Sequence, residues 1–261
     1  MKAIAKFAFI LMSASAWNMR SSHPQQTAPP PSTASSNHLE VPNDLNVPHG
    51  SGKVAIAWLG GLKGDVQLAN STGTEFQPAH AHTPVTEGNV LQTGMGRAEV
   101  EFDDNSAVRL GPYSSVEFHR LELLPSGART SNLSVFKGTV YVSVIPAYII
   151  KTRWEDFQLV FGQHLLHLQP SSHVRLELDA TGARLAVLDG TGRVDGPFGP
   201  TVLTKKKTFT FVSAGDSKPA VSNRVAANPM DAWDSSAVIV HQNNAKAGKM
   251  TGTLFRPPLR Q

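Results

Sequence analysis

The sequence predicts an all-β fold, either a multi-stranded β-sandwich or a solenoid-like sheet, with one helix near the C-terminus. Two patterns carry this prediction: short segments in which apolar and polar residues alternate, and clusters of turn-forming residues that separate them. A third observation adds the helix, because one late stretch has both a helix start signal and a stop signal.

The first sixteen residues have the layout of a secretory signal peptide. Lys2 and Lys6 precede an apolar run from Phe7 to Met12, and small residues lead to Ala16. This run is much shorter than the roughly 20 apolar residues that span a bilayer as a helix. We therefore expect an exported protein, periplasmic or extracellular, with no stable membrane span after signal cleavage. Whether the segment is cleaved or retained as an anchor stays open.

Residues 17–52 are rich in Pro, Ser, Thr and Asn and hold too few apolar side chains to bury a core. Such composition is typical of a disordered linker. The chain has no cysteine, so neither a disulfide nor a lipid-modified cysteine is expected. The folded domain that follows must be held together by its apolar core alone.

Residues 53–215 form the predicted β domain, with its core at 64–145. In the segment 97–102, Ala98, Val100 and Phe102 share one face, while the polar residues between them share the other. Similar alternation appears in six other segments: Val54, Ile56 and Trp58; Val108 and Leu110; Val116 and Phe118; Val140, Val142 and Val144; Val174, Leu176 and Leu178; and Phe209 and Phe211. Turns are predicted at residues 103–105, 125–127, 180–182, 189–190 and 196–197.

Residues 216–261 are predicted to hold the helix and a loose tail. Asn228 is the expected N-cap, Pro229 lies in the first turn, and Gly248 is the expected stop. We expect a stripe on this helix to dock on the sheet, formed by Met230, Trp233, Ala237 and either Val240 or His241.

Composition and motifs argue against several functional classes. The formal net charge is +4, and the only dense basic run is Lys205–Lys207. We interpret this run as a solvated turn or as charges that protect an edge strand from pairing, so no nucleic-acid partner is expected.

Two close histidine pairs, at residues 80 and 82 and at 164 and 167, lack a third ligand in sequence. They are interpreted as surface or loop histidines, and no metal or other cofactor is predicted. Glu99 and Glu101 are expected on the solvent face of their strand, and no catalytic motif is present, so no enzyme is predicted.

The stretch from Gly64 to Phe118 resembles the FecR protein domain of bacterial envelope proteins. The resemblance rests on short elements in a fixed order, followed by a strand–glycine–strand step. These elements are Gly64-Asp65-Val66, Gly88-Asn89-Val90-Leu91-Gln92-Thr93-Gly94, Ala98 to Phe102, Asp104-Asn105-Ser106, Val108 to Pro112, Val116 to Phe118, and Phe136-Lys137-Gly138-Thr139-Val140-Tyr141.

The best-known members of that family are signal relays, in which a cytoplasmic segment engages a sigma factor, one span crosses the membrane, and the FecR domain senses a transporter. Since the predicted export signal occupies the place of the first two parts here, no direct contact with a sigma factor is expected. The resemblance then implies an exported β-module that binds an envelope protein, in signalling or assembly.

The motif residues are expected to be structural: Gly64, Val66, Gly88, Thr93, Gly94, Leu110, Pro112 and Gly138. For contact with a partner or ligand, Trp58 and Trp154 are the candidates, because aromatic rings anchor protein interfaces and stack on sugars, although a packing role is the alternative for each. The second functional hypothesis is therefore a cell-envelope structural or polysaccharide-binding protein.

Overall fold

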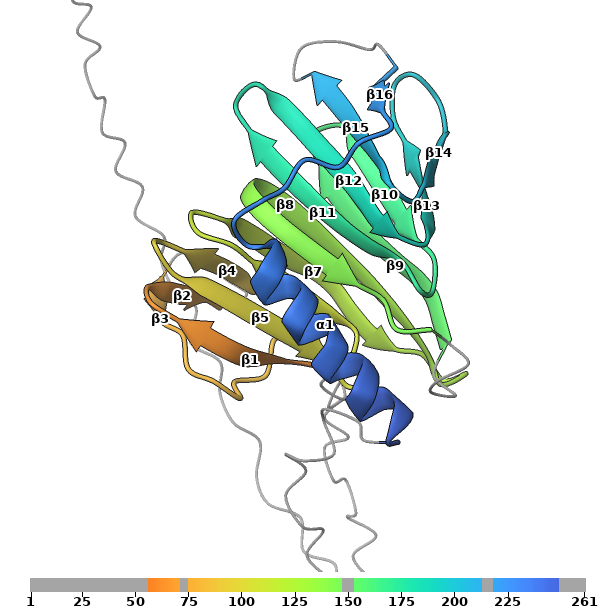
Figure 1. The fold of residues 1–261 in the computed structure, drawn as a ribbon. Helices are drawn as coiled ribbons and strands as arrows, with labels where there is room; N and C mark the ends of the chain where they lie inside the picture. Colours follow the sequence, from red (N-terminus) through yellow and green to blue (C-terminus); the bar gives the residue numbers. More distant parts are fainter. Residues whose placement is uncertain (1–55, 71–74, 147–152, 213–217, 249–261) are drawn as a thin grey trace, which may run out of the picture. The chain divides into compact units, whose positions relative to one another are not determined.

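The computed structural model describes residues 56–70, 75–146, 153–212 and 218–248. The predicted signal segment, the predicted linker, Val54 and the C-terminal tail lie outside these residues. The described part contains sixteen strands and one helix, so the all-β prediction with a C-terminal helix is confirmed (Figure 1). The strands are β1 (Ala57–Lys63), β2 (Val66–Ala69), β3 (Phe76–Pro78), β4 (Val90–Thr93), β5 (Arg97–Phe102), β6 (Ala107–Leu110), β7 (Ser115–Leu123), β8 (Ala128–Ser143), β9 (Arg153–Phe161), β10 (His164–Leu168), β11 (His173–Asp179), β12 (Gly182–Asp189), β13 (Thr191–Asp195), β14 (Thr201–Thr204), β15 (Lys207–Val212) and β16 (Ala220–Ser222).

The strands form two layers that share β8. The first half of β8 pairs with β7 and β9, and the second half pairs with β6 and β11. One layer, here the helix-side layer, has the order β1-β5-β6-β8-β11-β12-β15-β16, and the other, the open layer, has the order β3-β2-β4-β7-β8-β9-β10-β13-β14. Gly138 (φ +94°) lies where β8 passes from one layer to the other, at the strand–glycine–strand step.

Apolar side chains from the two layers meet in one core. The rings of Phe102 and Phe157 lie 5.4 Å apart in an edge-to-face arrangement, as do those of Phe161 and Phe211. The alternation predicted at 97–102 is confirmed, because Ala98, Val100 and Phe102 are fully buried. The predicted turns also separate strands as expected, and Asn105 adopts a left-handed conformation (φ +67°) between β5 and β6.

Ile56, directly before β1, is buried as expected, but within β1 the expected alternation is wrong by one residue. The buried side chains of β1 are Ala57 and Leu59, while Trp58 is half-buried and lies opposite Glu101. The register of β1 against β5 also shifts between Leu59 and Leu62, where two glycines interrupt the strand. Because the period of a strand is two, the one-residue offset moves Trp58 off the core face.

The helix α1 (Asp231–Lys246) begins two residues later than expected, because its N-cap is Met230 and not Asn228, and Pro229 precedes the first turn. The side chain of Asn228 accepts a hydrogen bond from the Met230 N–H (2.9 Å), and Asp231 accepts one from the Asn228 N–H (2.7 Å), as in a capping box. Gly248 (φ +69°) follows its end. No helix among the described residues is long and apolar enough to cross a membrane.

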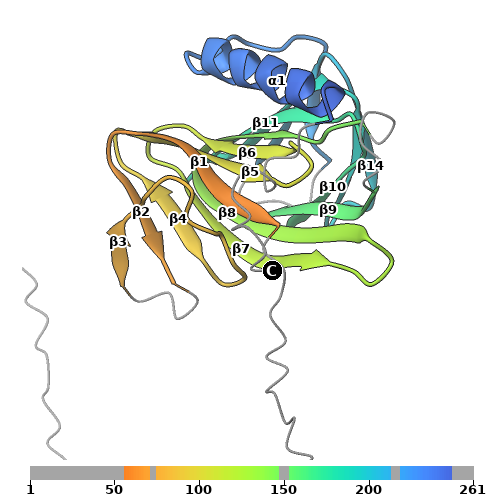
Figure 2. The ribbon, with the colours of Figure 1, turned by 90° about the horizontal axis from the view of Figure 1, so that it is seen from below.

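The helix covers the outer face of the helix-side layer, as predicted (Figure 2). Met230, Trp233 and Ala237 are half-buried there, and His241 is buried whereas Val240 is exposed. The docked face also holds Asp234, which is fully buried and was not expected to face the sheet.

The basic run and the histidines are placed as follows. Lys205 and Lys206 form the turn between β14 and β15, which confirms the interpretation of this run as a turn. His80 and His82 are exposed residues next to or within a turn, as expected. His164 is different, because it is half-buried against the rings of Phe161, Phe198 and Phe211.

Candidate functional site

Four segments that hold the predicted motif residues meet at one corner of the sandwich. These segments are the β1–β2 turn at Gly64, the β4–β5 turn 94–96, the β6–β7 turn 111–114 and the bend of β8 at Gly138. We call this place the motif corner. Thr93 ties two of the turns together, since its Oγ1 donates to the Gly111 carbonyl (2.7 Å) and accepts from the Ser114 N–H (2.9 Å). Its side chain is almost fully buried, so these bonds are protected from water.

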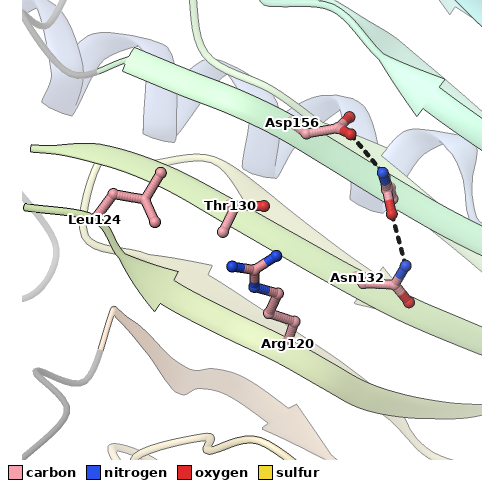
Figure 3. A pocket seen from close by; sticks show the side chains of 6 residues that line it. Arg120, Leu124, Thr130, Asn132 and Asp156 are labelled. Carbon is pink, nitrogen blue, oxygen red and sulfur yellow. Dashed lines mark hydrogen bonds between the residues drawn. The ribbon is translucent and has the colours of Figure 1, made fainter. Parts of the chain in front are cut away.

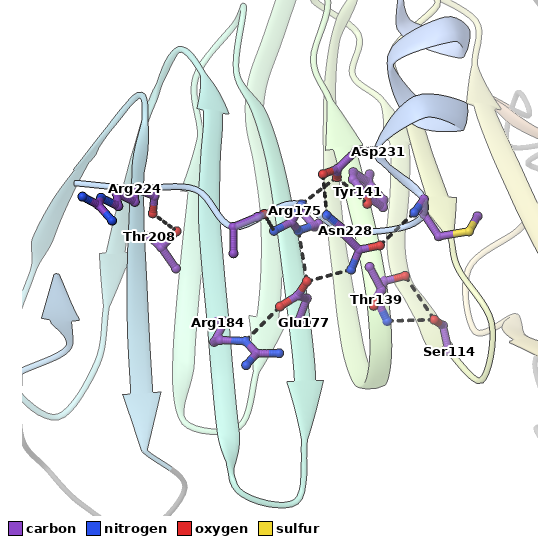
Figure 4. Close-up of polar contacts among 12 residues, drawn as sticks. Ser114, Thr139, Tyr141, Arg175, Glu177, Arg184, Thr208, Arg224, Asn228 and Asp231 are labelled. Atoms are coloured by element: carbon purple, nitrogen blue, oxygen red, sulfur yellow. Dashed lines mark hydrogen bonds and ion pairs between the residues drawn. The ribbon is translucent and has the colours of Figure 1, made fainter. Parts of the chain in front are cut away.

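Ser114 links the same turn to β8. Its hydroxyl donates to the Thr139 carbonyl (3.1 Å) and accepts from the Thr139 N–H (3.0 Å), as Figure 4 shows. The Tyr113 N–H donates to the Gly94 carbonyl (2.7 Å), which joins the β6–β7 and β4–β5 turns directly. The corner is therefore a hydrogen-bonded unit and not a set of independent loops.

Two glycine contacts allow the backbones to approach at this corner. Gly64 has a positive φ (+76°), and a Cβ placed there would lie 2.9 Å from Cα of Gly96. A Cβ on Gly138 would overlap Ser114, and its φ of +94° is one that other residues rarely adopt. These two positions give a physical reason for the glycines of the motif.

The motif corner also forms a pocket of about 270 Å³, whose lining residues are Lys63, Gly64, Met95, Gly96, Arg97, Pro112 and Met230. Met95, which lies between Gly94 and Gly96 in the sequence, is 80% exposed. Tyr113, next to the pocket residue Pro112, is 59% exposed and has a positive φ (+58°), which is uncommon for a bulky residue. Strained, exposed positions of this kind cluster at binding sites.

Two cations border the apolar part of this pocket. Lys63 is exposed, and the guanidinium of Arg97 lies 4.7 Å from the ring centroid of Trp233 on α1. The contact with Trp233 holds Arg97 in place without neutralising its charge. A pocket with methionine and proline walls and a cationic rim suits an apolar side chain that has a carboxylate beside it.

Seven of the eight motif residues predicted from the sequence lie at or next to the motif corner. These seven residues are Gly64, Val66, Thr93, Gly94, Leu110, Pro112 and Gly138. Gly88 does not join them; it precedes β4 at the other end of that strand, has a φ of +80°, and donates its N–H to the Phe118 carbonyl (2.7 Å).

The two tryptophans singled out for contact lie elsewhere. Trp58 is half-buried on β1 and forms a bridge with Pro84. Trp154 is the second residue of β9, where its backbone pairs with Arg129, and its side chain lies outside the described part. The sequence analysis missed Met95, Tyr113 and Met230; the available signal was a methionine between two glycines and a tyrosine directly after the corner proline.

A second polar cluster lies between α1 and the helix-side layer. Arg109 on β6 is fully buried, and its guanidinium bonds to Glu99 on β5, to Ser143 (3.1 Å) and to Asp234 on α1 (3.2 Å). His173 adds a second contact to Asp234 (2.7 Å). Buried ions that are paired in this way anchor the helix in one position.

The expectation that Glu99 and Glu101 face solvent is wrong for Glu99, which α1 buries. Burial disfavours the charged form of Glu99, but hydrogen bonding to His241 and the charge of Arg109 outweigh it and lower its pKa to about 2. Burial raises the pKa of Glu101, and the neighbouring Glu99 adds to this.

The side chains of Glu99, Glu101 and His241 offer ligand atoms within 4.8 Å of one another and could hold a divalent cation. Because Arg109 already bonds to Glu99, their arrangement is explained without one.

Arg175 makes a neighbouring set of contacts at the start of the helix (Figure 4). It donates to Asp231 (2.6 Å) and to the Ala226 carbonyl (2.6 Å), and lies 3.1 Å from Glu177. Tyr141 also donates to Asp231 (2.8 Å). The two arginines therefore hold the first half of α1, and with it Met230, the residue directly before the helix that lines the corner pocket.

Comparisons with known proteins reveal little similarity in sequence. No family model matches the chain, and no characterised protein matches it. Two crystal structures of a proposed anti-sigma factor from Parabacteroides distasonis align with it, each with a TM-score of 0.43. Their identities to this chain are 12% and 13%; the alignments cover 61% and 60% of this chain and 74% and 73% of the other. The function proposed below therefore rests on the geometry of the site.

Proposed function

We propose that this chain is an exported, non-catalytic β-module that binds an envelope protein through the motif corner. The observation that carries the proposal is Met95, which is 80% exposed beside a pocket of about 270 Å³. The turns that form this pocket are held in place by close glycine contacts and by buried hydrogen bonds. A rigid surface loses little entropy when a partner binds, and exposed methionine and tyrosine are enriched in protein interfaces.

The chemistry of the pocket defines the partner segment. Pro112, Met230 and Met95 offer apolar contact, and Lys63 and Arg97 offer positive charge. The matching segment has one large apolar side chain with an acidic residue close to it. The sequence resemblance supports the same class of function, since it implies an exported module that binds an envelope protein.

Site-directed crosslinking in the native host tests this proposal. A photoreactive residue at position 95 of the full chain is expected to capture one dominant protein, while the same residue at Val202 captures none above background. Val202 is a suitable control because it is 70% exposed and lies on β14, at the end of the open layer remote from β4.

The captured protein is then purified and its affinity measured. Met95→Glu and Lys63→Glu are each expected to weaken binding about tenfold, which corresponds to about 1.4 kcal/mol. Equal capture at positions 95 and 202, or an affinity that neither substitution changes, would refute the proposal.

Export is tested separately, because it rests on residues 1–16. N-terminal sequencing of the protein isolated from the cell envelope or medium is expected to begin after Ala16. An intact Met1 would instead support an anchored form of the protein.

A further inference from the structure

The outer face of the open layer has a polar groove that α1 does not cover. Its volume is about 410 Å³, and its lining residues come from β7, β8 and β9 and the turn after β7 (Figure 3): Arg120, Leu124, Thr130, Asn132, Asp156 and Gln158. No residue of this set takes part in the motif corner. The groove is therefore a separate feature, on the opposite layer from the helix.

Hydrogen bonds between side chains run across the strands from this groove. Asn132 donates to Gln158 (2.6 Å), and Gln158 donates in turn to Asp156. Beyond the groove, His167 on β10 lies 3.2 Å from Asp156 and 3.2 Å from Asp195 on β13. Asn132, Gln158 and His167 lie opposite one another on the neighbouring strands β8, β9 and β10, so these three residues repeat at about 4.8 Å, the spacing between strands.

These contacts fix the groove side chains without using all of their hydrogen-bonding capacity. An asparagine or glutamine has two N–H donors and a carbonyl with two lone pairs, and the bonds of this row use only part of this capacity at Asn132 and Gln158. The hydroxyl of Thr130 faces the same groove. Fixed amides, carboxylates and hydroxyls of this kind suit a ligand with many hydroxyl groups.

The lining residues of the groove carry one positive and one negative charge, those of Arg120 and Asp156, and Arg120 also bonds to Glu122 (2.6 Å). This arrangement gives no concentrated positive field for a polyanion and no concentrated negative field for a polycation. Leu124 adds one apolar surface, on which the carbon–hydrogen face of a sugar ring can pack.

From this geometry we infer that the groove binds a neutral polysaccharide, which lies across the strands with its sugar units spaced at about the strand repeat. The amides of Asn132 and Gln158 and the carboxylate of Asp156 bond to sugar hydroxyls. The chain then has two independent binding surfaces, a protein site at the motif corner and a glycan site on the open layer.

Affinity electrophoresis of the full-length protein tests the inference. The native gels contain one soluble polymer each: laminarin, hydroxyethylcellulose or dextran as neutral polysaccharides, and polygalacturonate as an acidic one. At least one neutral polymer is expected to retard the protein, and polygalacturonate is expected to retard it less. Absence of retardation by all three neutral polymers, or stronger retardation by polygalacturonate, would overturn the inference.

Matched variants locate the site. Asn132→Ala and Gln158→Ala are each expected to raise the dissociation constant at least fivefold, while Gln77→Ala, which removes an exposed amide from β3, leaves it unchanged. Thermal unfolding of each variant confirms that it is folded. Met95→Glu is expected to leave retardation unchanged, so failure of the glycan site and failure of the protein site are distinguishable. Retardation that neither groove substitution weakens would assign glycan binding to another surface and overturn the inference.

Discussion

Replacement of Thr93 by valine tests whether the motif corner is held by buried hydrogen bonds. Valine keeps the shape of threonine but removes Oγ1, so the Gly111 carbonyl and the Ser114 N–H lose the partner that they have at 2.7 and 2.9 Å. Thr93 is 6% exposed and Ser114 is fully buried, so water does not readily replace the hydroxyl. At about 1–3 kcal/mol for each of these two unsatisfied buried groups, the expected loss in unfolding free energy is about 2–6 kcal/mol.

Thermal and urea unfolding measure this loss. For a domain of this size the expected fall in Tm is about 4–24 °C. Thr210→Val is the matched control, because Thr210 is exposed on β15, and its expected effect is within about 0.5 kcal/mol. Thr93→Ser keeps the hydroxyl and is expected to cost only about 1 kcal/mol, for the lost methyl group. If Thr93→Val proves as stable as Thr210→Val, the hydrogen bonds do not hold the corner.

Three further predictions concern the core and the helix. Because the pKa of Glu99 is lowered from 4.5 to about 2, its ionisation stabilises the fold above pH 4.5, and this contribution is lost as the pH falls toward 2. The decrease in unfolding free energy over this pH range is expected to be smaller in Glu99→Gln than in Glu75→Gln, the control at an exposed position. Burial lowers the pKa of His164, so the folded state favours its neutral form, and stability is expected to fall as the pH drops below 6.5. In His164→Phe the unfolding free energy should decrease less over the same pH range, as measured by equilibrium unfolding. A pH profile that the substitution leaves unchanged would contradict this assignment. Gly138→Ala is expected to destabilise the fold by more than 1 kcal/mol in urea unfolding, because a Cβ would overlap Ser114 and φ is +94°, while Gly61→Ala, where a Cβ meets open space, is expected to cost less.

The two faces of the sandwich have different roles. Ion pairs from Arg109 and Arg175 hold α1 against the helix-side layer, and the helix in turn places Met230 in the corner pocket. The open layer has no such cover among the described residues, and its polar row is accessible. Loss of the helix is therefore expected to alter the protein site and to leave the glycan site intact.

The sequence by itself determined the local features of this protein. Alternation located β5, β6, β11 and β15, because a period of two residues needs no knowledge of the partner strand. Glycine and asparagine located the turns, since a positive φ is a property of single residues. The start of α1 was also predictable, because the cap around Asn228 forms within four residues.

Only the tertiary structure decided how these elements meet. The alternation at 97–102 shows that Glu99 and Glu101 share a face, but not that a helix more than 120 residues later covers it. The motif glycines were predicted as structural residues, yet the pocket at their corner depends on three turns far apart in the chain and on Met230, which directly precedes α1. The groove likewise joins side chains from three strands, two of which pair in parallel. Such features are set by pairing and packing between distant segments, which local sequence patterns do not encode.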